Sequence, residues 1–334
     1  MTAQPTRLQS DIDFNREGKQ VTYLRLPYSS NVSAYGWIGI PIAQIKNGPG
    51  PTVLFMAGNH GDEFEGQIAL AKLIRRLEPK DVKGRVILLP MANFPAAMAG
   101  YRTSSIDAGN LNRSFPGDPN GSVTQMIAHY IESVLMPMAM AVIDMHSGGR
   151  TLHYIPSALM AKDAGGEPDP KHLAALLAFG APVAYMVNFG ENRTSSAAAR
   201  RQGIMSIGTE LGGTGQVSPE TLKVAEQGVQ NMLEHFGLVQ PVAGRVKRQS
   251  RLMYVGGFEY YLHAPTRGWF EPFFDLGDAV KSGQVAGMMQ FLDEPLRDPV
   301  PVAFSQDGVV ICRRPHVQVE RGDCIAHLAT DVKR

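Results

Sequence analysis

Residues 53–66 read VLFMAGNHGDEFEG, an apolar run that stops at a glycine and then places a histidine three residues before a glutamate. The apolar run predicts a buried strand, and Gly58 and Gly61 allow the backbone to turn sharply after it. His60 and Glu63 would then project from one short turn at the end of that strand. Because a neutral imidazole and a carboxylate suit zinc, the stretch predicts a strand that ends in a metal-binding turn.

A second strand end supplies the candidate third ligand. Residues 141–149 read AVIDMHSGG, again an apolar run that ends in a histidine with glycines just beyond it. Catalytic zinc sites use three protein ligands and leave a fourth position for water. We therefore predict that His60, Glu63 and His146 hold one zinc ion per chain. Asp144 is a candidate to orient His146, although the alternation of faces along a strand argues against it.

The pattern around these strand ends predicts an α/β fold. Between residues 66 and 77 apolar side chains recur at helical spacing, and residues 84–90 form another short apolar run. A strand, a helix and a strand at this spacing indicate parallel pairing. Residues 93–117 hold few periodic apolar side chains and are interpreted as a long loop, which in a compact domain is usually functional. The expected architecture is a mixed sheet flanked by helices.

Four motifs lie in order along the chain: His60-x-x-Glu63, residues 110–113 (NLNR), the strand-end His146 and residues 208–210 (GTE). Together they resemble the succinylglutamate desuccinylase/aspartoacylase family, over most of the chain from roughly residue 20 onward. Members of this family are zinc deacylases on a carboxypeptidase-like fold, so the resemblance implies that fold here. Within the family, the chain most resembles the Nα-acetyl-L-2,4-diaminobutyrate deacetylases of ectoine breakdown, in the runs at 58–63, 105–107 and 110–117.

The resemblance also implies roles for residues outside the ligand set. Glu210, at the end of a strand expected over residues 204–210, would be the catalytic base that takes a proton from water and passes it to the departing nitrogen. Asn112 and Arg113 would bind the free carboxylate of the substrate. Arg102 would polarise the acyl carbonyl, although the segment between Arg102 and Asn112 differs in length from that of aspartoacylase.

Other polar residues leave alternatives open. Glu65 is a rival to Glu210 as the base, but it follows the ligands closely and is expected to cap a helix or face solvent. Arg193 and Arg200 fall in a Ser-rich loop and could complete the pocket or lie on the surface. These assignments depend on the fold.

A change of character after residue 240 predicts two domains. Residues 1–240, with N-terminal strands within residues 1–45, would form the zinc-dependent deacylase domain. Residues 241–334 are rich in short β-patterns and would form a small all-β domain.

The small domain carries a loose internal duplication. Its two Gly-Asp turns, at 277–278 and 322–323, resemble the barrel-sandwich fold of lipoyl and biotinyl domains. Such carrier domains present a lysine at a hairpin tip, and residues 290–307 contain none. We therefore expect a structural module and not a swinging arm.

Composition limits the partners and the compartment. A net charge of +1 gives no basic field for nucleic acid. The two cysteines, Cys312 and Cys324, make no disulfide framework, which suits a reducing cytoplasm. The apolar stretch at 134–143 is far short of the roughly 20 residues that a membrane span needs. We expect a soluble cytoplasmic enzyme without nucleic-acid or membrane partners, with homo-oligomerisation left open.

The sequence as a whole predicts a zinc-dependent amidohydrolase that cleaves a linear amide in a small N-acylated amino acid. We favour release of acetate from Nα-acetyl-L-2,4-diaminobutyrate in ectoine catabolism. Aspartoacylase, succinylglutamate desuccinylase or carboxypeptidase-like hydrolysis is the alternative among enzymes, and a non-catalytic binding module is a remote one. The His-Glu-x-x-His and Gly-x-Ser-x-Gly motifs of other hydrolases are absent. Asp107, Glu259 or Glu271 could bind the substrate ammonium, and the sequence does not choose among them.

Overall fold

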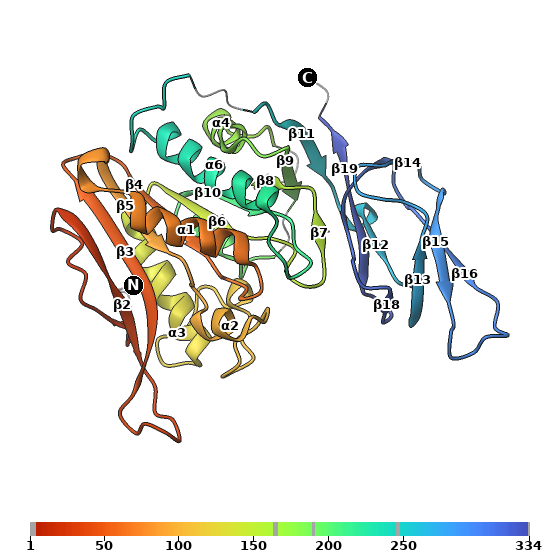
Figure 1. The fold of residues 1–334 in the computed structure, drawn as a ribbon, viewed down its shortest axis with the longest axis horizontal. Coiled ribbons are helices and arrows are strands. Elements are labelled where there is room, and N and C mark those ends of the chain that lie inside the picture. Colours follow the sequence, from red (N-terminus) through yellow and green to blue (C-terminus); the bar gives the residue numbers. More distant parts are fainter. Residues whose placement is uncertain (1–4, 163–165, 189–190, 245–247, 333–334) are drawn as a thin grey trace.

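One large mixed sheet runs through the part of the molecule that the structure, a computed structural model, describes: residues 5–162, 166–188, 191–244 and 248–332. Its strands are β1 (Gln9–Ser10), β2 (Gly18–Pro27), β3 (Trp37–Asn47), β4 (Thr52–Ala57), β5 (Gly84–Leu89), β6 (Ala141–Met145), β7 (His153–Tyr154), β8 (Ser157–Lys162), β9 (Val183–Asn188), β10 (Met205–Glu210), β11 (Arg251–Val255), β12 (Tyr261–His263), β14 (Ala279–Val280), β17 (Gly308–Arg313) and β19 (Cys324–Asp331). The order is β1-β2-β3-β5-β4-β6-β10-β8-β9-β11-β19-β17-β14, with β12 beside β19 and β7 beside β17 (Figure 1).

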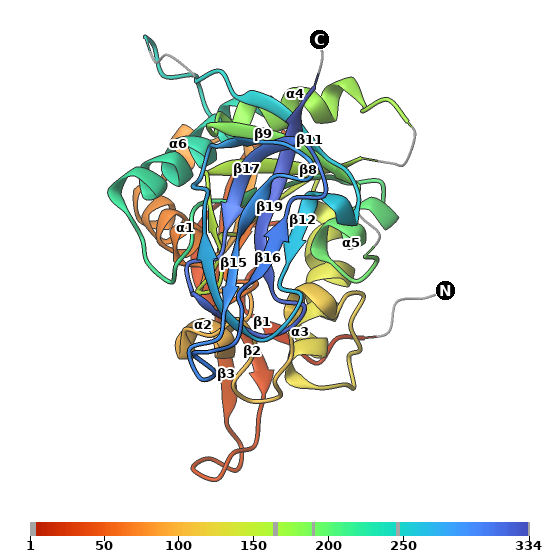
Figure 2. The same ribbon diagram turned by 90° about the vertical axis from the view of Figure 1, so that its right-hand side faces the viewer.

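A smaller antiparallel sheet lies at the C-terminal end of the molecule, in front in Figure 2. Its strands are β13 (Gly268–Pro272), β15 (Val285–Gln290), β16 (Val300–Ala303) and β18 (Gln318–Val319), in the order β16-β15-β13-β18. Apolar side chains from both sheets, such as Phe270, Met289 and Val310, share one buried cluster. The two Gly-Asp turns also have the same hydrogen bond, because Asp278 and Asp323 each accept the backbone N–H three residues before them.

Helices cover both faces of the large sheet. They are α1 (Phe64–Arg76), α2 (Phe94–Ala99), α3 (Val123–Tyr130), α4 (Pro170–Phe179), α5 (Ser195–Arg201) and α6 (Pro219–His235). Helices α1, α4 and α6 share one buried cluster with the sheet, whereas α3 and α5 contribute to a cluster on its other face. In the described part of the chain no helix is long and apolar enough to cross a membrane. The expected mixed sheet flanked by helices is confirmed.

The centre of the sheet positions the site because neighbouring strands run in the same direction. Strands β5, β4, β6 and β10 are parallel, as predicted for β4 and β5. Ala57 at the end of β4 lies opposite Met145 at the end of β6. Gly208 of β10 lies opposite Asp144 of β6, so the next residue on the same face, Glu210, is level with His146. The predicted ligands and the predicted base therefore leave the sheet at one edge.

Two segments differ from the sequence prediction. The stretch at 93–117 is not wholly a loop, because it contains α2 and a short 3₁₀ turn at Leu111–Arg113. The Ser-rich loop that was expected around Arg193 and Arg200 contains α5, whose N-cap Thr194 accepts the N–H of Ala197. Both helices are too short to show a repeating apolar pattern, which is why the sequence did not reveal them.

The main sheet continues past residue 240. Strand β11 pairs in parallel with β9 and antiparallel with β19. The C-terminal strands are therefore hydrogen-bonded to the part that carries the predicted site. The division into domains at residues 240 and 241 stays a prediction.

Candidate metal and active site

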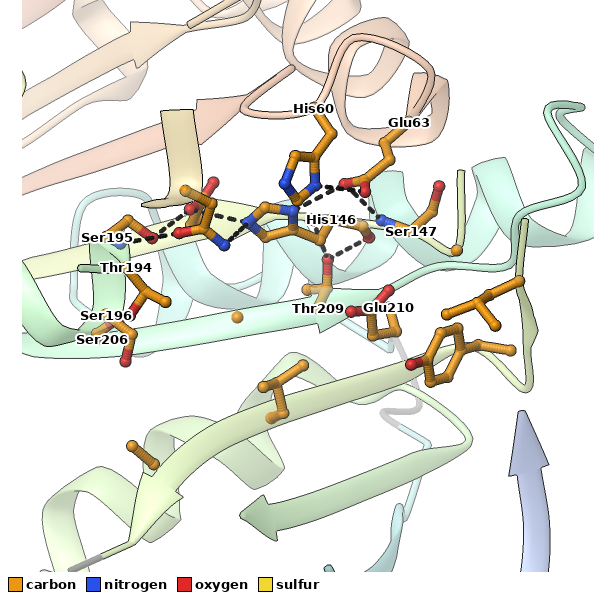
Figure 3. A pocket seen from close by; sticks show the side chains of 18 of the residues that line it. His60, Glu63, His146, Ser147, Thr194, Ser195, Ser196, Ser206, Thr209 and Glu210 are labelled. Carbon is orange, nitrogen blue, oxygen red and sulfur yellow. Dashed lines mark hydrogen bonds and ion pairs between the residues drawn. The ribbon is translucent and has the colours of Figure 1, made fainter. Parts of the chain in front are cut away.

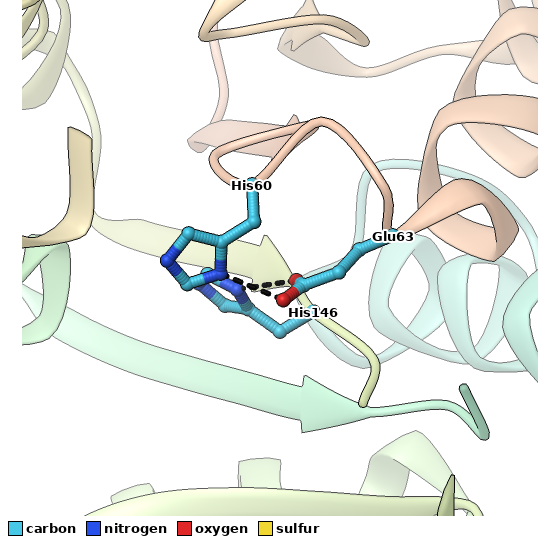
Figure 4. Close-up of side chains that lie close together, drawn as sticks. All are labelled: His60, Glu63 and His146. Carbon is cyan, nitrogen blue, oxygen red and sulfur yellow. Dashed lines mark hydrogen bonds and ion pairs between the residues drawn. The ribbon is translucent and has the colours of Figure 1, made fainter. Parts of the chain in front are cut away.

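His60, Glu63 and His146 come together at the ends of β4 and β6 (Figure 4). Nδ1 of His60 lies 2.7 Å from Oε1 of Glu63, and Nδ1 of His146 lies 2.7 Å from Oε2 of the same carboxylate. Among the His, Cys, Asp and Glu side chains of the described residues, these three could share a metal ion, because their ligand atoms all lie within 4.8 Å of one another. The predicted ligand set is thus assembled in space and could hold a metal ion.

Glycines shape the turn that carries the first two ligands. Gly58 follows β4 with a φ of 68°, a conformation that side chains other than glycine rarely adopt. A Cβ on Gly61 would lie 2.0 Å from the backbone of Ala96, so the turn can pack against α2 only with a glycine there. The turn then delivers Glu63 directly in front of α1. The short sequence between strand and helix therefore fixes the spacing of His60 and Glu63.

Each histidine has an oxygen acceptor on its outer nitrogen. Nε2 of His146 lies 3.1 Å from Asp144 Oδ2, and Nε2 of His60 lies 3.2 Å from Asn110 Oδ1. Such acceptors favour the tautomer with hydrogen on Nε2, which directs the lone pair of Nδ1 at Glu63. A lone pair and a carboxylate oxygen repel each other, so a proton or a cation has to lie between them. Because catalytic zinc takes two imidazoles and one carboxylate, this donor set fits a zinc ion.

The surrounding charges favour a cation at this point. Burial opposes ionisation of Glu63, yet the imidazoles of His60 and His146 lower its pKa well below the usual value. Burial also disfavours a charged His146, yet Asp144 and Glu63 raise the pKa of that imidazole well above its usual value. Two buried carboxylates therefore stabilise positive charge beside His146, which a bound metal ion would supply in place of a proton.

A cavity of about 230 Å³ opens beside the three ligands. Its lining includes the three predicted metal ligands, the predicted base and the three residues predicted to bind the acyl and carboxylate groups: His60, Glu63, His146, Glu210, Arg102, Asn112 and Arg113. Figure 3 shows Glu210 at one end of this cavity and the side chains of Ser195, Ser196 and Ser206 at the other. The structure thus brings these seven residues together, while their individual roles stay predictions.

Glu210 has the environment of a group that exchanges protons. It is the last residue of β10, and its Oε2 is buried without a hydrogen-bond partner among the described residues. Burial, together with the nearby carboxylate of Glu63, raises the pKa of Glu210 well above its usual value. A carboxyl group with a raised pKa holds a proton more readily than an ordinary carboxylate does, which suits a group that accepts a proton and passes it on.

The two arginines occupy different positions around the cavity. Nη1 of Arg102 lies 3.2 Å from His60 Nδ1 and 3.5 Å from Glu63 Oε1, next to the ligands. Arg113 lies further out, where its Nη1 donates to the backbone oxygen of Asn112 at 2.7 Å. Nδ2 of Asn112 is 3.4 Å from His146 Nε2, so the Asn112 and Arg113 pair adjoins the predicted metal ligands.

Comparison with known proteins agrees with this geometry. A sequence model described as the succinylglutamate desuccinylase/aspartoacylase catalytic domain matches residues 49–236, more than half of the chain. The chain belongs to the succinylglutamate desuccinylase/aspartoacylase family. The predicted resemblance and the carboxypeptidase-like fold that it implied are confirmed. As a member of this family, the chain is an enzyme, an amidohydrolase.

Similar proteins align over nearly the whole chain. A protein of Halomonas elongata named N-alpha-acetyl-L-2,4-diaminobutyric acid deacetylase is 42% identical over 330 residues, which cover 98% of this chain and 96% of that protein. The crystal structure of a succinylglutamate desuccinylase/aspartoacylase from Rhodobacter sphaeroides is 40% identical with a TM-score of 0.91, covering 98% of this chain and 100% of that one. The product-bound structure of the ectoine utilization protein EutE (DoeB) from Ruegeria pomeroyi is 36% identical with a TM-score of 0.91, covering 98% and 99%.

Two expectations about neighbouring acids in this family member were wrong. The alternation of faces does not separate Asp144 from His146, because residues two apart on a strand share a face, and their side chains are in contact. Glu65 neither faces solvent nor lies at a cap, since it is only 1% exposed inside the first turn of α1. Sequence reasoning also missed Ser195, whose hydroxyl donates to Asp144 and which carries no local signal of that role.

The three acids considered for a substrate ammonium lie outside the cavity lining. Asp107 accepts hydrogen bonds from the N–H and the hydroxyl of Thr124. Burial raises the pKa of Asp107, but its hydrogen bonds lower the pKa by more, so that it falls to about 2. Glu259 accepts the N–H of Gly257, and Glu271 accepts from the side chain of Gln290. Each of these carboxylates supports local structure.

Proposed function

We propose that this enzyme is a zinc-dependent deacetylase of Nα-acetyl-L-2,4-diaminobutyrate, which it hydrolyses to L-2,4-diaminobutyrate and acetate. The observation that carries the proposal is a single cavity that combines the His60, Glu63 and His146 cluster with the unpartnered carboxylate oxygen of Glu210 and with Arg113. The 42% identity with a deacetylase of this name supports the choice of substrate. The ectoine utilization protein EutE, 36% identical, supports a place in ectoine breakdown.

The metal ligands and the base Glu210 have separate roles in the hydrolysis. A zinc ion held by the three ligands would lower the pKa of a water molecule towards about 7 and polarise the acyl carbonyl. Oε2 of Glu210 accepts the proton from the attacking water, because nothing else among the described residues occupies that oxygen. The same carboxyl group then donates the proton to the amide nitrogen as the carbon–nitrogen bond breaks. Its raised pKa suits both steps.

The arginines hold the two oxygen-rich parts of the substrate. The guanidinium of Arg102, beside His60 and Glu63, donates to the acyl oxygen as negative charge develops on it. Arg113 presents a planar fork that suits the free carboxylate of the amino acid, with Asn112 as a second donor. The substrate would therefore lie between Arg102 and Arg113, with its amide bond facing Glu210.

The charge of the cavity favours a substrate with one carboxylate and one ammonium. Among its described lining residues the cavity has two cations, Arg102 and Arg113, which the proposed mechanism already uses. The end of the cavity away from Glu210 offers the hydroxyls of Ser195, Ser196 and Ser206, which can accept hydrogen bonds from an ammonium. A side-chain carboxylate, as in N-acetyl-aspartate, would meet no further cation there and would be costly to bury.

Several finer expectations accompany this proposal. We infer one zinc ion per chain and a small N-acylated amino acid as the partner. A cytoplasmic location and the absence of nucleic-acid and membrane partners stay predictions, and homo-oligomerisation stays open. The division into a deacylase domain and a small β-rich domain is likewise a proposal.

A panel of N-acylated amino acids tests the proposal. We expect kcat/KM for Nα-acetyl-L-2,4-diaminobutyrate to exceed that for N-acetyl-aspartate or N-succinyl-glutamate at least about tenfold, because a mispaired buried charge costs roughly 1.4 kcal/mol or more. A chelator should abolish the activity, and added zinc should restore it. A preference for either dianion would overturn the diaminobutyrate assignment and leave the deacylase assignment intact. Full activity in chelator would overturn the role of the metal.

A further inference from the structure

The catalytic cavity is longer than the proposed substrate requires. Both Glu210, at the end of β10, and Ser206, near its beginning, line the cavity. Four residues of extended strand span about 13 Å at about 3.3 Å each. The side chain of 2,4-diaminobutyrate has only two methylene groups between Cα and its nitrogen. Part of the cavity beyond the reacting amide therefore lies past the end of this side chain.

The contacts around the site indicate which end of the cavity receives the amino-acid side chain. Asn112, half of the proposed carboxylate-binding pair, accepts the N–H of Ser195 at 2.9 Å. The carboxylate would therefore bind next to the serine-lined end, where Figure 3 places Ser195, Ser196 and Ser206. The other end has Tyr154 and the apolar side chain of Leu152, which suit a methyl group. The acetyl group thus lies towards Tyr154 and the amino-acid side chain towards Ser206.

A second cavity of about 330 Å³ adjoins the serine-lined end. The two cavities share three lining residues, Ala161, Ser196 and Ser206, all of which have small side chains. Because these side chains are small, little side-chain volume separates the two cavities at this junction. No other residue of the described chain lines both cavities.

The second cavity can receive an ammonium without a buried partner. Its charged or titratable lining residues are Asp169, His172 and Arg200. Asp169 and Arg200 are exposed, so water reaches this cavity and can hydrate an ammonium there. Nε2 of His172 is occupied, because it lies 2.7 Å from the backbone oxygen of Ser206. Asp169 attracts a cation and Arg200 repels one, so the two charges oppose each other at this cavity. Water that reaches the cavity would therefore be what stabilises the ammonium.

We propose that this enzyme also deacetylates Nα-acetyl-L-ornithine and Nα-acetyl-L-lysine, whose longer side chains pass Ala161, Ser196 and Ser206 into the second cavity. The inference rests on the proposed function, because it uses the same reacting groups and the same direction of binding. The reaction is the same hydrolysis: water adds its hydroxyl to the acetyl carbon and its hydrogen to the α-nitrogen, so that the carbon–nitrogen bond breaks. Only the place of the side-chain ammonium differs.

The first test compares three substrates on the zinc-loaded enzyme. We expect kcat/KM for the acetylated ornithine and lysine to lie within about tenfold of that for the acetylated diaminobutyrate, since the added methylenes meet open space. If the diaminobutyrate derivative is cleaved and both longer ones are more than 100-fold slower, this inference is overturned while the proposed function stands. If none of the three is cleaved, the proposed function fails and takes this inference with it.

The second test narrows the junction from the β8 side. Ala161→Leu places a larger side chain between the two cavities and should lower kcat/KM for the lysine derivative at least about tenfold more than for the diaminobutyrate derivative. Because both substrates are measured on one preparation, partial misfolding cancels in the ratio. Ala161→Ser, which keeps the residue small, is the matched control and should leave the ratio unchanged. An unchanged ratio in Ala161→Leu would show that the lysine side chain does not pass this junction.

Discussion

Oδ2 of Asp144 lies 3.1 Å from Nε2 of His146, two residues further along the same strand end. The same oxygen also receives hydrogen bonds from the side chains of Asn59 and Ser195. These partners hold the carboxylate in place, and the carboxylate in turn orients the imidazole so that Nδ1 faces Glu63. A ligand whose orientation is fixed before the metal arrives binds that metal more tightly than a free side chain does.

The first prediction concerns metal content. His146→Ala should hold much less zinc than the wild-type protein, which we expect to contain about one zinc ion per chain, because a site with three protein ligands has none to spare. Elemental analysis of the purified proteins measures this. His129→Ala, on α3 and outside the cavity lining, is the matched control and should keep its zinc. Full occupancy in His146→Ala would place the third ligand elsewhere.

The second prediction concerns the base. Glu210→Gln should retain zinc but lose turnover by roughly 10²-fold or more, since an amide cannot exchange the proton. Steady-state kinetics and zinc content, measured on one preparation, separate the two effects. Glu220→Gln, an exposed residue in the first turn of α6, is the control for a change of glutamate to glutamine. Turnover near the wild-type value in Glu210→Gln would remove this residue from the mechanism.

The third prediction concerns the substrate carboxylate. Arg113→Lys should raise KM with kcat little changed, because an ammonium keeps the charge but cannot make two parallel hydrogen bonds. Arg193→Lys is the matched control, since Nε of Arg113 and Nε of Arg193 lie 3.8 and 3.5 Å from the same Glu191 carboxylate but only Arg113 lines the cavity. If kcat/KM is unaltered in Arg113→Lys, another group holds the carboxylate.

The fourth prediction concerns His327, which is buried in the C-terminal strands. Its ring lies flat against Tyr261, with centroids 4.4 Å apart, and neither ring nitrogen has a hydrogen-bond partner among the described residues. Burial lowers the pKa of His327 to about 3. The unfolded chain binds a proton below about pH 6.5, whereas the folded protein does not until the pH approaches 3, so the free energy of unfolding should fall as the pH drops below 6.5.

The size of this loss can be measured by substitution. At pH 5, proton uptake by His327 in the unfolded chain lowers the free energy of unfolding by roughly 2 kcal/mol. His327→Phe should abolish this loss because a phenyl ring fits among tyrosines and takes up no proton. Denaturant unfolding at pH 7 and pH 5 compares the two proteins. His316→Gln, an exposed histidine, should leave the wild-type pH dependence in place. Equal losses in wild type and His327→Phe would contradict the assignment.

The turn that carries the candidate metal ligands could be predicted from the sequence because its causes are local. His60 and Glu63 are three residues apart, after an apolar strand and between glycines, so short-range backbone geometry alone brings them together. His146 could be added because a second apolar run ends in the same way. The family motifs then supplied Glu210 and Arg113, which the structure places in the same cavity.

Only the tertiary structure decided how these separate segments meet. The register that pairs Gly208 with Asp144 sets Glu210 level with His146, and no local pattern encodes a pairing between strands more than 60 residues apart. The contact of Asn110 with His60, and the junction at Ala161, likewise join residues that are distant in the chain. Apolar periodicity reports which face of an element is buried, and the motifs at the strand ends report candidate ligands, so the sequence determined the strands, the predicted metal ligands and the family resemblance. The partners of each side chain depend on packing between elements, and these had to be seen in the fold.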